Sequence, residues 1–303
     1  MHTYILNFAP TGMVPTKALN SHTPISVSEI VEDVLCAAEF GASIAHLHAR
    51  DADSGAPVVC PDVYGKIIEG IRRYHKTLVL CVSLSGRNVS DPCLRAAPLN
   101  LTGAEKPDMG SLTLSSLNFA KQASVNAPGT IDYLAGRMKE LGIAPELEIF
   151  DLGMANYVAV LQKKHLLPAV PYTNILLGNI FGAQVSPAHL AALTTALPGN
   201  MMLSVAGLGD YQLDANVMGL ACGYGVRIGL EDNLWQDRQR KVLASNHSLL
   251  KRITSIAGDM GRHPLPADRL RAALGLQAGS GEYGVRPDEE LPSAPNIRQA
   301  ILK

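Results

Sequence analysis

Short apolar segments alternate with amphipathic helical segments along almost the whole chain, and this alternation is the strongest constraint on its fold. Eight segments have the length and composition of buried strands. They are residues 4–8, 43–48, 78–83, 108–113, 146–150, 174–177, 201–206 and 226–230. Neighbouring parallel strands need a crossover connection, which is usually a helix, so the alternation predicts a parallel sheet. Eight such units predict a (β/α)8 TIM barrel, an α/β fold that forms a single domain over residues 1–276.

Several of the expected helices carry recognisable end signals. Ser26 followed by Glu29 is a capping box, Ser186 precedes a proline at the first helical position, and Thr130 is expected to cap another helix. The expected helices are residues 26–41, 61–74, 130–141, 154–165, 186–197, 211–221, 237–260 and 267–274. Residues 277–303 are polar and rich in Gly and Pro, so we expect a C-terminal arm or tail.

A doubly wound parallel sheet is the main alternative to the barrel. Such a fold usually carries a glycine-rich phosphate loop of the form G-x-G-x-x-G. The closest segment, Gly207-Leu208-Gly209, has no third glycine at the required offset, and the sequence has no Walker-type loop. The barrel is therefore the favoured fold.

Composition limits the classes of partner. Of the 303 residues, 47% are hydrophobic and 5% are aromatic, and the formal net charge is −1. These values give no reason to expect a nucleic acid or a membrane as partner, so we expect small-molecule ligands. Five scattered cysteines without a C-x-x-C pair, and a first segment without signal-peptide character, predict a soluble cytoplasmic protein with reduced thiols.

Two histidines end the second predicted strand. His46 and His48 are two positions apart, so in an extended strand both imidazoles point to the same face. Imidazole is a common ligand of zinc, copper, iron and nickel. A histidine pair is also compatible with a structural role, so a metal site requires a third ligand.

A second polar cluster ends the last predicted strand. Arg227 and Glu231 share strand parity, and Asp232 follows directly. Together with His46 and His48, Glu231 would complete an open set of two imidazoles and one carboxylate, as found in catalytic zinc sites and in iron oxygenases. The two acids are also compatible with a helix N-terminus, and Arg227 with a buried partner for one of them.

Polar residues also follow the third, fourth and fifth predicted strands, and the active site of a TIM barrel lies at these carboxyl ends. They are Ser83, Ser85, Ser111, Thr113, Glu146 and Glu148. An unpaired carboxylate inside a barrel costs free energy, so at least one of the two glutamates is expected to have a function. Cys81, on the third strand, and Cys222 are expected to be core residues.

Six stretches of the chain together resemble the β-keto acid cleavage enzyme family, which includes 3-keto-5-aminohexanoate cleavage enzymes. The stretches are residues 9–13 (APTGM), 46–51 (HLHARD), 82–87 (VSLSGR), 107–109 (PDM), 115–119 (SSLNF) and 229–233 (GLEDN). The resemblance implies a zinc-dependent barrel, usually a homotetramer, that reacts a β-keto acid with acetyl-CoA. The products would be acetoacetate and a new acyl-CoA, formed by Claisen and retro-Claisen steps.

The resemblance also implies roles for individual residues. It places the metal ligands at His46, His48 and Glu231, and the catalytic residues at Asp232, Arg227, Ser83 and Glu148. In this reading Asp232 removes a proton from the substrate while Arg227 holds it in place. We assign substrate binding to Ser85, Gly86, Ser111, Thr113 and Asn233.

Three positions depart from the family pattern. Leu84 stands where Thr is common, which predicts a more apolar edge to the pocket. Val14 offers no carboxylate for a cationic substrate group, and Asp210 stands where many relatives carry Arg.

Three other functions are compatible with a barrel of this kind. A metal-dependent hydrolase would need further His or Lys ligands on the fifth and sixth strands, and residues 174–177 have none. An aldolase-like lyase would need a Schiff-base lysine, but no predicted strand ends in lysine. A catalytically silent scaffold would have no reason to retain the cluster of His46, His48, Arg227, Glu231 and Asp232.

Overall fold

The computed structural model describes residues 2–287, in which eight parallel strands close into a barrel, so the predicted TIM-barrel fold is confirmed. Each barrel strand pairs with the next barrel strand along the chain, and the last pairs with the first. The barrel strands are β2 (Leu6–Phe8), β3 (Ile44–Leu47), β4 (Val79–Val82), β5 (Met109–Thr113), β8 (Ala144–Ile149), β9 (Tyr172–Leu177), β10 (Met202–Gly207) and β11 (Gly225–Ile228).

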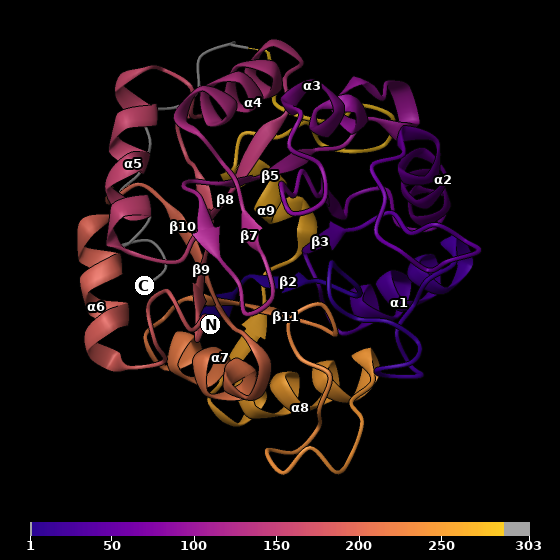
Figure 1. Cartoon of the computed structure of the whole chain (residues 1–303), viewed down its shortest axis with the longest axis vertical. Coiled ribbons are helices and arrows are strands. Elements are labelled where there is room, and N and C mark those ends of the chain that lie inside the picture. The colour runs from indigo at the N-terminus through magenta and orange to yellow at the C-terminus, as the bar shows by residue number, and fades with distance from the viewer. Residues whose placement is uncertain (1, 288–303) are drawn as a thin grey trace.

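Most helices form a ring around the strands, whereas α9 lies across one end of the barrel (Figure 1). The helices of the described residues are α1 (Val27–Glu39), α2 (Pro61–Arg72), α3 (Pro92–Arg95), α4 (Pro128–Glu140), α5 (Leu152–Lys163), α6 (Pro187–Ala196), α7 (Gln212–Ala221), α8 (Asn246–Asp259) and α9 (Ala267–Ala273). The main core lies between this ring and the outer face of the barrel. A second core fills the amino end of the barrel, where Leu270 and Leu274 from the α9 region pack against Ile5 and Ile44.

Smaller elements lie at the two ends of the barrel. β1 (His2–Tyr4) pairs with β12 (Arg262–Pro264), and β6 (Leu117–Asn118) forms a hairpin with β7 (Ala123–Ser124) in the connection after β5. Three 3-10 helices complete the elements: η1 (Ala97–Asn100), η2 (Gly103–Glu105) and η3 (Gly209–Tyr211). Within the described part of the chain, no helix has the length and apolar character needed to cross a membrane.

Two of the predicted helix starts are confirmed and one is wrong. The Ser26 hydroxyl accepts from the Glu29 amide, and the Glu29 carboxylate accepts from the Ser26 amide, which is the predicted capping box. The Ser186 hydroxyl accepts from the His189 amide at the start of α6. Thr130, however, lies inside α4, which begins at Pro128 because proline favours the first turn of a helix.

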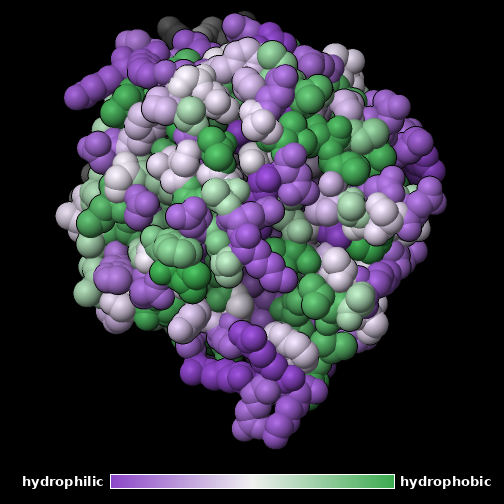
Figure 2. Space-filling model, viewed as in Figure 1, coloured by the Kyte–Doolittle hydropathy of each residue, from purple (hydrophilic) through white to green (hydrophobic). Residues whose placement is uncertain are grey.

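The expected helix at 237–260 is also wrong in its first third. Residues 234–245 form a loop, and α8 begins only at Asn246, after a capping box between Ser245 and Ser248. The Asp237 carboxylate accepts from the amides of Lys241 and Val242 and so closes a turn that competes with a helix. Figure 2 shows this loop as a hydrophilic projection below α8.

Only the first part of the predicted C-terminal arm lies within the described residues. Between Gln277 and Pro287 the chain runs along the amino end of the barrel, with a bridge between Leu276 and Val285. The Gly284 amide donates to Asp108, which lies directly before β5. Residues 288–303 of the arm lie outside the described part.

A buried ion cluster holds this amino end together. The Asp108 carboxylate is fully buried and accepts from Arg271 at 2.7 and 2.8 Å and from Arg72 at 3.1 Å. It therefore connects α2, β5 and α9, which are distant in the sequence. Each charge is compensated only while the others are present.

Asp108→Asn is predicted to lower the free energy of unfolding by about 3 kcal/mol, because it leaves two buried arginines without their carboxylate. Urea denaturation measures the change. Asp214→Asn, which removes an exposed carboxylate paired with Arg238, is the control and should change stability little. An Asp108→Asn protein as stable as this control would contradict the structural role.

Candidate active site

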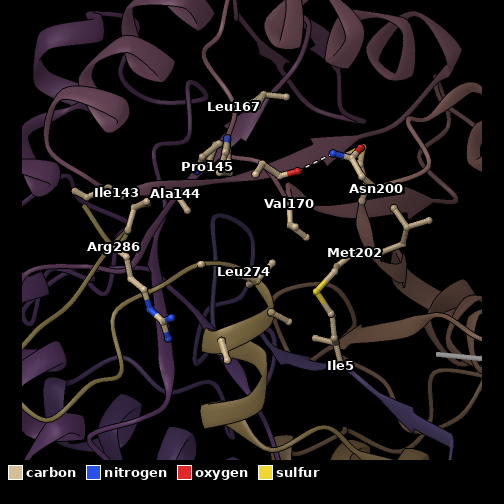
Figure 3. Close-up of a pocket in the computed structure, with 18 of the residues that line it drawn as sticks. Ile5, Ile143, Ala144, Pro145, Leu167, Val170, Asn200, Met202, Leu274 and Arg286 are labelled. Carbon is tan, nitrogen blue, oxygen red and sulfur yellow. Dashed lines mark hydrogen bonds between the residues drawn. The ribbon is translucent and has the colours of Figure 1, made fainter. Parts of the chain in front are cut away.

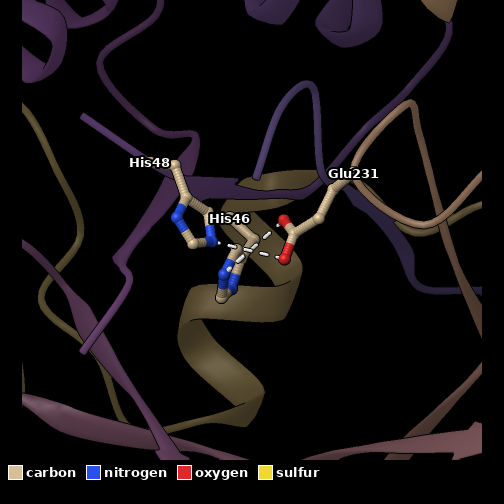
Figure 4. Close-up of side chains that lie close together, drawn as sticks. All are labelled: His46, His48 and Glu231. Carbon is tan, nitrogen blue, oxygen red and sulfur yellow. Dashed lines mark ion pairs between the residues drawn. The ribbon is translucent and has the colours of Figure 1, made fainter. Parts of the chain in front are cut away.

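Three side chains from two strand ends converge at the carboxyl end of the barrel. Figure 4 shows His46, His48 and Glu231 pointing toward one another. His48 Nε2 lies 3.2 Å from Glu231 Oε1, and His46 Nε2 lies 3.8 Å from Glu231 Oε2. The candidate ligand atoms of the three residues all lie within 4.8 Å of one another, so one metal ion could contact all of them.

Two glycines let the backbone near Glu231 pack closely against the loop after β2. β11 ends at Ile228, and Gly229 adopts φ +149°, a conformation that side chains rarely permit. A Cβ at Gly229 would lie 2.0 Å from the Ala9 carbonyl oxygen, and one at Gly12 would lie 2.2 Å from Glu231 Cγ. Glycine at both positions lets the loop after β2 pack directly against the loop that carries Glu231.

One carboxylate oxygen of this group has no partner in the protein, as expected for an atom that binds a metal ion. Glu231 Oε2 is buried and has no hydrogen-bond partner among the described residues. A buried carboxylate oxygen without a partner is costly, and a cation beside it would remove that cost. The chemistry of the donors, two imidazoles and one carboxylate, also fits a divalent transition metal with open positions.

A buried glutamate orients His46 from behind. Glu146 Oε2 accepts from His46 Nδ1 at 2.5 Å, which leaves Nε2 free to face Glu231. Asn7 and Asn174 donate to the other oxygen of Glu146 at 2.7 and 2.9 Å. This is the arrangement of a carboxylate that fixes the tautomer of a metal-binding histidine.

The charges around Glu146 act in the direction expected for such a pair. Burial opposes ionisation of Glu146, but His46 outweighs it and lowers the pKa of Glu146 to about 2. Burial likewise opposes protonation of His46, yet the charges of Glu146 and Glu231 raise its pKa to about 9. The inward position of Glu146 agrees with the expectation that one of the two β8 glutamates is paired, but sequence alone did not indicate His46 as its partner.

Cys81 is buried, as expected, and its Sγ donates to Glu146 Oε2 at 3.1 Å. The expectation is wrong for Cys222, which is exposed because it follows the last turn of α7. His46, Cys81 and Glu146 form a second group of close donors. The short contact between His46 and Glu146 is a hydrogen bond, which leaves no space for a metal between them. The His46, His48 and Glu231 group is therefore the better candidate.

Arg227 is the central cation of the site. Its fully buried guanidinium contacts Glu231 Oε1 at 2.9 Å, Asp232 Oδ2 at 3.0 Å and Glu148 Oε1 at 3.3 Å. Burial opposes the charge of Arg227, but the neighbouring carboxylates outweigh it and raise its pKa. Arg227 and Glu231 do lie together, but not through the strand alternation expected from the sequence. β11 ends at Ile228, and the turn that begins at Gly229 brings Glu231 against Arg227.

The pKa values of the two neighbouring carboxylates, Glu231 and Asp232, are shifted in opposite directions. Burial raises the pKa of Glu231, but Arg227 and the two histidines outweigh this effect and hold the pKa below its usual range. For Asp232 the effect of burial prevails over Arg227, and its pKa is raised. One acid is thus suited to bind a cation, and the other to accept a proton.

The remaining predicted residues lie around this centre with different partners. Glu148 accepts from the Thr113 hydroxyl at 2.7 Å, and the Ser111 hydroxyl accepts from the Leu84 amide at 3.0 Å. Ser83 and Ser85 line a cavity of about 340 Å³ that also includes His48. Gly86 packs closely against Arg95 and the Val125 carbonyl, and the Asn233 side chain is engaged with the backbone of Trp235.

The three departures from the family pattern have different structural consequences. Leu84 is buried in the main core and is not among the residues that line the small cavity, so it does not form the expected apolar pocket edge. Val14 is exposed, and Asp210 pairs with Arg240 at 3.0 Å outside the cluster of carboxylates.

A larger cavity lies at the opposite end of the barrel. It has a volume of about 1410 Å³ and is lined mainly by apolar residues from strand starts and from the α9 region, including Ile5, Val170, Met202 and Leu274 (Figure 3). It contains none of the histidine and carboxylate cluster. Active sites of TIM barrels lie at the carboxyl ends of the strands, so the small cavity beside His48 is the relevant one.

The fold and this cluster define a TIM-barrel enzyme, and comparison with known proteins identifies its family. A family model described as beta-keto acid cleavage enzyme matches residues 3–276. The chain therefore belongs to the β-keto acid cleavage enzyme family, and the resemblance noted from its sequence motifs is confirmed.

Individual relatives agree with this assignment. The 3-oxoadipate:acetyl-CoA acetyltransferase of Cupriavidus necator is 33% identical over 275 residues, which cover 90% of this chain and 94% of the relative. The 3-keto-5-aminohexanoate cleavage enzyme of Fusobacterium nucleatum is 31% identical, over 91% of this chain and 99% of the relative. A solved complex of ObcA with a C4-CoA adduct and oxalate shares the fold, with a TM-score of 0.72 at 21% identity over 84% of this chain and 68% of ObcA.

Glu146→Gln is predicted to weaken binding of a divalent metal by about 10- to 100-fold, because it removes the charge that orients His46. Competition of the metal-free protein with a chelator for Zn²⁺ measures the affinity. Glu69→Gln, at an exposed position of α2, is the matched control. Equal affinities of the two variants would show that Glu146 does not support the metal ligands.

Proposed function

We propose that the chain is a zinc-dependent enzyme that reacts a β-keto acid with acetyl-CoA to give acetoacetate and a new acyl-CoA. The observation that carries the proposal is the position of Arg227, which holds Asp232 directly beside the group of His46, His48 and Glu231. The family assignment and the names of the relatives support the same chemistry.

His46, His48 and Glu231 would hold the zinc ion. Two imidazoles and one carboxylate are a common protein ligand set for catalytic zinc, with at least one position left for substrate. When bound, the metal would act as a Lewis acid that acidifies the carbon between the keto and carboxylate groups of the substrate.

Asp232 is the proposed general base. Its carboxylate is held by two hydrogen bonds from Arg227, from Nε at 3.0 Å and from Nη2 at 3.3 Å, so its position is fixed before substrate arrives. Burial raises its pKa, which makes it a stronger proton acceptor than an exposed aspartate. Arg227 in turn is held by Glu148 and Glu231, so the base is oriented by a buried network.

The reaction balances with one proton taken and returned. Asp232 removes a proton from the carbon between the two carbonyl groups, and that carbon attacks the acetyl-CoA carbonyl and releases the CoA thiolate. The thiolate attacks the original keto carbon, and cleavage of the bond to the central carbon gives the new acyl-CoA. The central carbon takes back the proton and leaves as acetoacetate.

Ser83 and Glu148 are proposed to position the intermediates. Ser83 lines the small cavity with His48, and its carbonyl is held by the Tyr64 hydroxyl at 3.2 Å. Glu148 contacts both Arg227 and Thr113. Ser85, Gly86, Ser111, Thr113 and Asn233 remain the proposed substrate-binding residues.

The names of the relatives give different substrates, including 3-oxoadipate, 3-keto-5-aminohexanoate and 3-dehydrocarnitine, so membership of the family does not select one substrate for this chain.

The proposal includes the assembly and the location of the protein. The resemblance implies a homotetramer, and the unpaired cysteines indicate the cytoplasm.

The purified protein is predicted to contain about one zinc ion per chain, as expected for a single three-ligand site. It should form acetoacetate from acetyl-CoA and at least one β-keto acid, since the ligands lie beside the proposed base. Metal analysis and chromatography of CoA esters measure the two properties.

His46→Ala should lose metal and activity together. Zinc without turnover would favour the hydrolase alternative, and stoichiometric zinc in His46→Ala would overturn the ligand assignment.

Asp232→Asn is predicted to keep the metal and the fold but to lower kcat by at least about 100-fold, because it removes the proposed base. Steady-state kinetics and metal content are measured on the same preparation. Asp53→Asn, an exposed aspartate in the loop after β3, is the control. A rate for Asp232→Asn near that of the control would exclude Asp232 as the base.

A further inference from the structure

Backbone hydrogen bonds fix the last described residues along the amino end of the barrel. The amides of Val285 and Arg286 donate to backbone carbonyls at 2.8 and 3.0 Å. Both residues, and Pro287 after them, belong to the lining of the large cavity at this end, which we call the amino-end cavity. The chain that follows, residues 288–303, therefore starts at this cavity.

The amino-end cavity is larger than a site for a small ligand needs to be. Its volume of about 1410 Å³ exceeds the roughly 300–1,000 Å³ of typical small-molecule sites. Ile5, Val170, Met202 and Leu274 line it side by side (Figure 3). Contiguous apolar surface of this kind marks a place where another piece of polypeptide binds.

The rim of the amino-end cavity is positively charged. Lys106, Lys139, Arg269 and Arg286 belong to its lining. Glu140, the one carboxylate among the described lining residues, is already paired at 2.6 Å with an arginine one turn earlier in α4. An acidic segment would be attracted to this rim.

The sequence of residues 288–303 complements the cavity in charge and in hydrophobicity. Residues 288–290 are Asp-Glu-Glu, directly after the point where the described chain reaches the basic rim. Ile297, Ala300 and Ile301 follow at the i, i+3, i+4 spacing by which a peptide places apolar side chains in a groove. The family model ends at residue 276, so this complementarity belongs to the part of the chain beyond the family match.

The segment of the same chain is favoured over one from a second copy. Because Pro287 is held at the cavity, an attached segment samples the groove at an effective concentration on the order of millimolar. An extended segment of this length reaches roughly 50 Å, whereas the radius of gyration of a domain of this size is about 19 Å. It can therefore cross the whole cavity, from Pro287 to Cys222 at the end of α7.

We propose that residues 288–303 dock in the amino-end cavity of their own chain. The acidic start of the segment lies against the basic rim, and Ile297 and Ile301 pack on the apolar lining. The docked segment covers the apolar surface beside α9 and extends as far as Cys222. This inference is independent of the proposed function, because the cavity lies at the end of the barrel opposite to His46.

The thiol of Cys222 reports whether the cavity is covered. Cys222 lines the cavity and is exposed among the described residues, and the exposed Cys93 of α3 serves as an internal reference. In the whole chain, a bulky maleimide should label Cys222 at least about 10-fold more slowly than in Ile297→Asp/Ile301→Asp, because burial of each isoleucine favours docking. The rate at Cys93 should be the same in both proteins. Mass spectrometry of the labelled peptides measures the two rates.

Asn296→Asp/Gln299→Asp is the matched control, because it adds the same charge to the same segment and keeps both isoleucines. It should label Cys222 as slowly as the unmodified chain does. Equal rates at Cys222 in the unmodified chain and in the isoleucine double variant would overturn the proposal. Rapid labelling in both would show an open cavity, and slow labelling in both would show a different cover, such as a face of a second copy.

Mixed assemblies distinguish the same chain from a neighbouring copy. The isoleucine double variant is produced together with a chain that carries Cys222→Ser and an unchanged C-terminal segment. If each segment docks on its own chain, Cys222 of the double variant is labelled as rapidly as in the double variant alone. Slow labelling would show that the segment of a neighbouring copy fills the cavity, and it would overturn docking within one chain.

Discussion

The candidate site depends on one buried cation, Arg227. A fully buried guanidinium is stable only when carboxylates surround it, and here three of them do so, from β8 and from the loop after β11. The same contacts fix Glu231 beside the two histidines and Asp232 beside Glu231. One ion-pair network thus sets the position of a proposed metal ligand and of a proposed base, so neither can move without disturbing the other.

The two ends of the barrel use buried charge for different purposes. At the amino end, Asp108 is saturated by Arg72, Arg271 and backbone amides, which suits a purely structural cluster. At the carboxyl end, Glu231 Oε2 lacks a hydrogen-bond partner among the described residues. A metal ion bound beside the two histidines would supply that partner.

Much of this architecture could be predicted from the sequence, because it follows from local periodicity. The eight barrel strands and the caps at Ser26 and Ser186 depend on neighbours a few residues away. Strand alternation did not predict how Glu231 reaches Arg227, because β11 ends at Ile228 and a turn places Glu231. The loop at 234–245 was missed because side chain–backbone bonds from Asp237 replace an apparently helical pattern. The pairing of His46 with Glu146 joins residues a hundred positions apart, so it leaves no signal in a single sequence.

The most direct test of this account is the zinc K-edge X-ray absorption spectrum of the purified protein. Coordination by His46, His48 and Glu231 predicts nitrogen and oxygen neighbours at about 2.0–2.2 Å with the multiple scattering of imidazole and no sulfur. A sulfur neighbour at about 2.3 Å would place the metal at Cys81 instead and contradict the proposed site. A protein that binds no zinc at all would show that the paired histidines and Glu231 are structural.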